Sequence, residues 1–163
     1  MPKMENLTLL VLKGHLLLEE LINATGDALL PNPSALKAAQ LGCFQRTRRL
    51  MALIPDMGFN GPLVAFEKLN AIRNKYGHML EPPQIEERIL AFVDFVEGPM
   101  EPAQRASVTR LPERLSRAIS FLCGQLEMVS PFYLGASQLI PLNKDYEDEA
   151  LTSQHEPPHG DSP

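Results

Sequence analysis

The stretch LNAIRNKYGH, residues 69–78, places Arg73 and Asn74 side by side and a histidine, His78, four residues after the asparagine. Its apolar residues recur at spacings of three and four, which is the pattern of a helix with one buried face. These residues are Leu69, Ile72 and Tyr76. A polar cluster on such a helix is either a solvated helix end or a site that binds phosphate.

Helical spacing determines which of these side chains share a face. Residues four apart lie almost above one another, so Asn70, Asn74 and His78 form one polar column with Arg73 at its edge. Arg73 and His78 are five residues apart, which separates them by roughly 140° around the helix axis. They converge only if the helix ends or distorts near Gly77, or if a second copy of the chain supplies the missing partner.

The residue types suit metal-free chemistry on RNA. An arginine binds phosphate through two parallel hydrogen bonds and keeps its charge, whereas a histidine exchanges a proton near neutral pH. His78 would deprotonate the ribose 2′-hydroxyl or protonate the leaving oxygen, and Arg73 would stabilise the charge that grows on the phosphate. No group of His, Cys and carboxylate residues has metal-ligand spacing, so we expect neither a metal nor another cofactor. In the simpler interpretation, Lys75 and His78 only favour the negative end of a helix dipole.

The hydrophobic pattern of the whole chain predicts an all-α protein, an antiparallel bundle of about five helices. Expected helices cover 4–24, 62–77 and 84–97, and a last one begins between Thr109 and Pro112 and ends near Ser130. The segment from Pro33 to Ile54 is interrupted at Gly42 and forms either two short helices or one broken helix. We predict one helical domain over residues 1–132 and an irregular, acidic, disordered tail over residues 133–163.

Charge is distributed unevenly along the 163 residues, whose formal net charge is −5. Residues 1–143 hold 14 Lys and Arg against 14 Asp and Glu, whereas residues 144–163 hold one against six. A neutral body argues against broad nucleic-acid binding, which needs a basic surface, but it leaves room for a small local site. Two arginine groups are candidates to guide RNA, although such charges are more often a solvated helix face. They are Arg46, Arg48 and Arg49, and Arg110, Arg114 and Arg117.

The cysteines and the apolar runs indicate the compartment. Cys43 and Cys123 both lie in apolar helical context, so we expect small buried side chains in a reducing environment. No apolar run reaches the roughly 20 residues that a membrane span requires. The predicted location is therefore the cytoplasm, with no membrane partner.

Three polar residues of the first helix complete the candidate set. His15 lies beside the apolar face, and we expect a hydrogen-bonded interior or interface histidine rather than a catalytic one. Glu19 or Glu20 is a candidate partner for Arg73 across the bundle, and we expect at least one of the two to lie at the surface.

Three segments, taken in order, resemble the HEPN superfamily of helical domains. A signature of that superfamily is an Arg, a polar residue and then a His four to six positions beyond the Arg, which Arg73, Asn74 and His78 match. The preceding segments LVLKGHLLLEELIN (10–23) and ALKAAQLG (35–42) look like the mannitol operon repressor-like branch in particular. The resemblance covers roughly residues 4–97.

The resemblance implies an all-α homodimer in which two motifs face each other and form a metal-independent endoribonuclease site. Carried over to this chain, Arg73 would hold the scissile phosphate, Asn74 would orient it or the histidine, and His78 would be the acid–base group. Such proteins belong to toxin–antitoxin or phage-defence systems, where the partners are RNA and a cognate antitoxin or regulatory protein.

Two departures from the family pattern and one alternative function accompany this expectation. Toxin members often have a Tyr two residues after the His, where this chain has Leu80, and the residue before the His is commonly Ala rather than Gly77. Repressor-like members are regarded as regulators, and no DNA-reading helix-turn-helix is recognisable in the sequence. The alternative is therefore a non-enzymatic regulatory module in which Arg73, Asn74 and His78 build a dimer interface.

Overall fold

The computed structural model describes residues 2–37, 39–54, 60–79 and 82–137. Over these ranges the chain forms seven helices and no strand, which confirms the predicted all-α fold. The helices are α1 (Pro2–Ala28), α2 (Ser34–Lys37), α3 (Cys43–Leu53), α4 (Asn60–His78), α5 (Ile85–Glu97), α6 (Pro102–Ala106) and α7 (Leu111–Ser137). No helix in the described part of the chain is long and apolar enough to cross a membrane.

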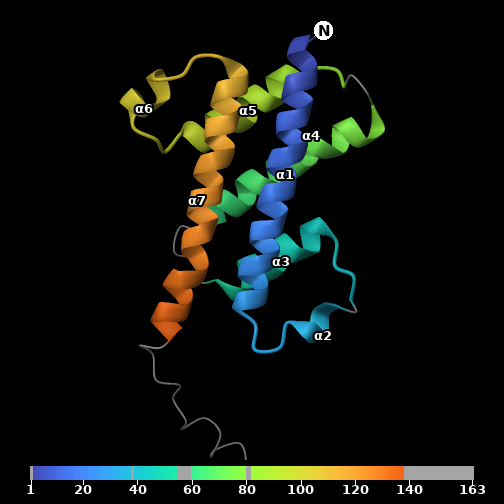
Figure 1. Cartoon of the computed structure of the whole chain (residues 1–163), viewed down its shortest axis with the longest axis vertical. Helices are drawn as coiled ribbons and strands as arrows, with labels where there is room; N and C mark the ends of the chain where they lie inside the picture. Colours follow the sequence, from blue (N-terminus) through green and yellow to red (C-terminus); the bar gives the residue numbers. More distant parts are fainter. Residues whose placement is uncertain (1, 38, 55–59, 80–81, 138–163) are drawn as a thin grey trace, which may run out of the picture.

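The helices form two layers around a single apolar core. Figure 1 shows the long helices α1 and α7 side by side in front, with α3, α4 and α5 crossing behind them. The helices α1, α4, α5 and α7 contribute apolar side chains at spacings of three and four, and this stripe faces the other layer. The largest fully buried apolar side chains are Phe66, Phe92, Leu18, Ile22, Leu50, Leu63, Leu69, Ile89, Leu115, Leu122 and Leu126.

Boundaries agree with the sequence prediction only in part. The interrupted segment forms two helices, α2 and α3, which is one of the two predicted alternatives, whereas the short helix α6 after α5 was not predicted. The predicted end of the last helix near Ser130 is wrong, because α7 continues through Pro131 to Ser137. A proline inside a helix removes one hydrogen bond and crowds the carbonyl four residues before it, so it usually ends or kinks the helix. Pro131 is exposed on α7 while the neighbouring Val129 is buried. The tail that we predicted to be disordered lies, from residue 138 onward, outside the described residues.

Close contact between α1 and α7 depends on a glycine. A Cβ atom on Gly14 would lie 2.4 Å from Cδ1 of Ile119 and 3.0 Å from its Cγ1, so only a residue without a side chain fits there. Because a β-branched isoleucine has few rotamers in a helix, it cannot easily move aside. Gly14 therefore sets how closely the two front helices approach each other.

A buried carboxylate joins α5 to α7. Glu97, which is 2% exposed, accepts hydrogen bonds from Nη2 of Arg114 at 2.6 Å and from Nη2 of Arg117. Burial alone would raise the pKa of Glu97, but the two guanidinium groups outweigh this effect and hold it below the ordinary value. Arg117 also donates to the backbone oxygen of Gln104 at 2.6 Å. Arg114 and Arg117 thus fix the turn that carries α6, and neither of these two candidate RNA guides has its guanidinium free.

Gly14 and Gly124 provide a matched pair of helix-interior glycines. Gly14→Ala should lower the free energy of unfolding by about 1–3 kcal/mol, because the methyl group forces α1 away from α7. Gly124→Ala should instead raise it by up to about 1 kcal/mol, because Gly124 has open space around it and alanine favours the helix. Urea unfolding followed by circular dichroism measures both values. Equal stabilisation by the two substitutions would show that the contact at Gly14 does not limit the packing.

Candidate functional site

An open cavity of about 520 Å³ lies between α1, α3 and α4. It contains two of the three predicted site residues, Arg73 and Asn74. Its lining consists of His15, Glu19, Gly42, Cys43, Phe44, Gln45, Asn70, Arg73 and Asn74. The cavity combines amide groups, one guanidinium, one imidazole and one carboxylate.

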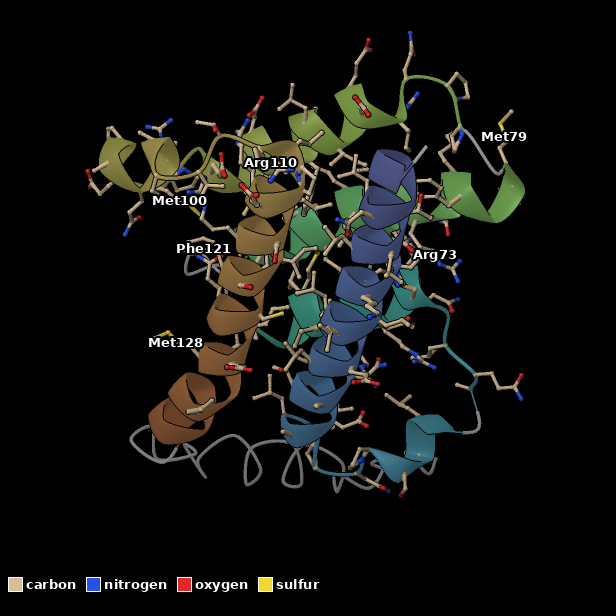
Figure 2. All side chains as sticks on the ribbon, turned by 45° about the horizontal axis from the view of Figure 1, so that its top comes forward. Arg73, Met79, Met100, Arg110, Phe121 and Met128 are labelled. Atoms are coloured by element: carbon tan, nitrogen blue, oxygen red, sulfur yellow. The ribbon has the colours of Figure 1, made fainter. Side chains whose placement is uncertain are left out.

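Arg73 offers an unpaired guanidinium at this cavity. It is exposed, and Figure 2 shows it on the flank of the bundle beside α1. Its Nη1 donates a hydrogen bond of 3.3 Å to Oδ1 of Asn74, and no described carboxylate lies within ion-pair distance of it. A guanidinium has five N–H donors, so most of those on Arg73 remain available to a ligand.

His78 lies apart from Arg73 within one chain. It is the exposed last residue of α4 and does not line the cavity. The helix is continuous through Gly77, since the backbone N–H of Met79 donates to the oxygen of Lys75 at 3.0 Å. The helix ends only after His78, so both side chains stand on helical backbone and point roughly 140° apart. Of the polar column, Asn70 and Asn74 reach the cavity.

His15 occupies the floor of the cavity. It is 3% exposed, and its Nε2 lies 2.9 Å from Oδ1 of Asn70, an oxygen that can only accept a hydrogen bond. The ring stacks on Phe66 with the centroids 5.2 Å apart, and Nδ1 lies 3.7 Å from Oε2 of Glu19. This geometry confirms the prediction of a hydrogen-bonded interior histidine.

The environment of His15 disfavours its protonated form. Burial lowers the pKa of the imidazole, and the positive charge of Arg73 lowers it further. The hydrogen bond to Asn70 and the carboxylate of Glu19 act in the opposite direction, but burial outweighs both. At neutral pH, His15 therefore donates through Nε2 and leaves Nδ1 without a proton.

Cys43 adds a thiol to the cavity wall. Its Sγ lies 3.8 Å from Nε2 of His15, so thiol, imidazole and the Glu19 carboxylate follow one another as in a cysteine nucleophile with its base and orienting acid. The electrostatics contradict that role. Burial and the charge of Glu19 raise the pKa of Cys43 to about 11, so the thiolate hardly forms. Cys43 and Cys123 are both free and half-buried, as expected for small packing residues.

The arginine triplet of α3 is engaged in ion pairs. Arg46 lies 3.9 Å from Oε1 of Glu19, and Arg48 and Arg49 lie 3.1 and 3.2 Å from the carboxylates of Glu67 and Asp27. These contacts join α3 to α1 and α4. Glu19 thus pairs with Arg46 and His15 rather than with Arg73, while Glu20 is exposed on the surface of α1.

Sequence reasoning missed Phe44 and Gln45 and did not assign the other residues to one cavity. His15 and Glu19 lie four apart on α1, and Asn70 lies four residues before Asn74, so helical spacing does place each pair on one face. It does not reveal that α1 and α4 turn those faces toward each other, because that depends on how the layers cross. In the described part of the chain, no group of three or more His, Cys, Asp or Glu residues is arranged to hold a metal ion.

Comparison of the chain with protein-family models, with curated proteins and with solved structures finds no match. The geometry of the cavity therefore carries the functional argument.

The buried imidazole makes stability depend on pH. Because the folded pKa of His15 lies below its unfolded value of about 6.5, the unfolded chain binds the proton first as the pH falls. His15 therefore contributes stability above pH 6.5 that is lost as the pH falls toward its folded pKa. Urea titrations at pH 7.5 and 5.5 should show a smaller loss of stability for His15→Gln than for wild type. His78→Gln, a change at an exposed position, should leave the loss unchanged, and an equal loss in all three proteins would contradict the assignment.

Proposed function

We propose that this chain is a HEPN-type protein that binds RNA at the α4 surface and cleaves it as a metal-independent endoribonuclease homodimer. Proteins of this kind serve toxin–antitoxin or phage-defence systems, where a cognate antitoxin or regulatory protein is the further partner. The single observation that supports the proposal is the unpaired guanidinium of Arg73 at the open cavity, next to the amide of Asn74.

Arg73 differs from the other arginines near the cavity. The guanidinium groups of Arg46, Arg48 and Arg49 are each paired with a carboxylate, which leaves them less able to attract a phosphate. The donors of Arg73 face solvent and the cavity instead. A phosphodiester placed there would receive two parallel hydrogen bonds from the guanidinium and a further one from an asparagine amide.

Cleavage would proceed by attack of the neighbouring ribose hydroxyl. The 2′-oxygen forms a bond to phosphorus while the bond to the 5′-oxygen breaks, which leaves a 2′,3′-cyclic phosphate and a free 5′-hydroxyl. A base accepts the 2′-hydroxyl proton, and an acid supplies a proton to the 5′-oxygen. Arg73 stabilises the extra negative charge on the phosphate during this exchange, and an exposed His78 from a second chain is the proposed proton carrier.

A second candidate function is a non-enzymatic regulatory or protein-interaction module. The observation that favours it is the group of exposed leucines on α1, which are 37–58% accessible at Leu9, Leu12, Leu16 and Leu17. Exposed apolar patches on soluble domains commonly mark association surfaces. In this case Arg73, Asn74 and His78 would contribute to an interface rather than to a reaction.

An RNA cleavage assay in EDTA separates the two functions. Wild type should cleave RNA and yield cyclic phosphate ends, whereas Arg73→Ala and His78→Ala should each lose at least about a hundredfold in rate. Arg105→Ala removes an exposed arginine of the distant helix α6 and should cleave as wild type does. Denaturing gel electrophoresis and end-group analysis measure the products. Absence of cleavage by a folded wild-type protein would contradict the nuclease and favour the regulatory module.

The identity of the acid–base histidine has its own test. His15→Gln preserves a hydrogen-bonding side chain beside Asn70 but cannot exchange a proton, and it should retain most of the cleavage rate if His78 carries the proton. Single-turnover cleavage rates of His15→Gln and His78→Ala over pH 5–8 should therefore differ by at least about tenfold. Loss of activity only in His15→Gln would move the proton transfer to the floor of the cavity.

A further inference from the structure

One face of α1 is exposed and apolar. Leu9, Leu16 and Leu17 are 49%, 58% and 53% accessible, and the charged residues Lys13 and Glu20 lie among them. Figure 1 shows α1 at the front of the molecule, and no described element lies over it. A surface helix of a soluble domain normally turns polar residues to this side, so the exposed leucines require an explanation.

The exposed residues form a continuous strip along the helix. Positions 9, 13, 16, 17, 20 and 24 are all exposed and fall within roughly 100° of arc. The strip lies opposite the residues that enter the core, namely Val11, Leu18 and Ile22. On the adjoining helix α7, exposed Ser116 and Ser120 flank the Ile119 that contacts Gly14. Their side chains are short, so they do not obstruct an approach to α1.

Two charges on the strip have no partner in their own chain. Neither Lys13 nor Glu20 forms an ion pair with any residue that the structure describes. They are seven residues apart, or roughly 10 Å along the helix axis, so they are too distant to pair with each other. Each therefore presents an unpaired charge on the midline of the strip, between the leucines.

The strip is complementary to itself in the antiparallel direction. If a two-fold axis passes between Leu16 and Leu17, Lys13 faces the partner's Glu20, and Glu20 faces the partner's Lys13. The same operation keeps each flank of α1 on one side of the dimer, so Leu16 lies against the partner's Leu16 and Leu17 lies against the partner's Leu17. Isologous interfaces require this kind of self-complementarity, in which one patch supplies both halves of every contact.

We propose that this chain forms a two-fold dimer through the exposed strip of α1, which packs antiparallel against the same strip of a second copy. The central contacts are leucine against leucine, and Lys13 and Glu20 form an ion pair on each side of the axis. A two-fold axis perpendicular to the paired helices does not exchange their flanks, so the two cavities open on the same flank of the dimer. This inference rests on the homodimer of the proposed function and names its interface, although it uses none of the cavity residues.

Sedimentation velocity on the full chain tests the surface. Wild type should sediment as a dimer at micromolar concentration, and Leu16→Glu should raise the dissociation constant by at least about a hundredfold, because it buries a charge at the centre of the strip. Leu90→Glu is the matched control, since Leu90 is a 40% exposed leucine on α5, and it should leave the dimer unchanged. Circular dichroism melting confirms that both variants stay folded, as expected for changes at exposed positions.

A charge exchange tests the antiparallel register. Lys13→Glu and Glu20→Lys should each weaken the dimer by about tenfold, because each substitution creates two like-charged pairs per dimer. The double variant Lys13→Glu/Glu20→Lys should restore wild-type affinity. Any of three results would overturn the proposal. They are a monomeric wild type at 100 µM, a dimer that survives Leu16→Glu, and a double variant weaker than both single variants. A monomer would also indicate that the strip is covered by another segment, such as residues 138–142.

Discussion

The contact between Gly14 and Ile119 determines where every other part of this molecule lies. A helix pair can approach this closely only where one member lacks a side chain, and α1 has its glycine at the point where the branched isoleucine of α7 arrives. With α1 and α7 fixed as one layer, the core stripe of each turns toward α3, α4 and α5. In this orientation of α1, His15 lies on one flank of the helix and the exposed leucines lie on its front face.

His15 and Arg73 line the same cavity but differ in charge. His15 is surrounded by protein, so the cost of desolvating a charge keeps it neutral. Arg73, on the adjacent helix, retains its charge, and its position near His15 adds to the preference for a neutral imidazole. A fixed positive charge therefore lies in the same cavity as a neutral imidazole, whose one N–H is already donated to Asn70. A negatively charged group that can accept hydrogen bonds is the natural complement to the guanidinium.

The sequence predicted much of the fold because the controlling signals are local. Apolar spacing in α1, α4 and α5 and the interruption at Gly42 gave the helices to within a few residues. The end of α7 was wrong because Pro131, which usually stops a helix, lies inside this one. Long-range features were harder to infer. Nothing in the spacing of Cys43, His15 and Glu19 shows that three segments of the chain place them around one cavity, since this depends on the crossing angles of the helices.

The turn between α5 and α7 is held mainly by charges and backbone atoms. Glu97 anchors Arg117, which in turn binds the carbonyl oxygens of Gln104 and Arg105, and the side chains of α6 are all exposed. Any amino acid supplies a carbonyl oxygen, so the contacts to positions 104 and 105 do not depend on their side chains, whereas the turn also uses the buried Met100 and the hydroxyl of Ser107. The exposed positions of α6 can accordingly vary without a change in these contacts. The same property makes α6 a suitable place to attach a fluorophore or an affinity tag, because neither the core nor the cavity would be disturbed.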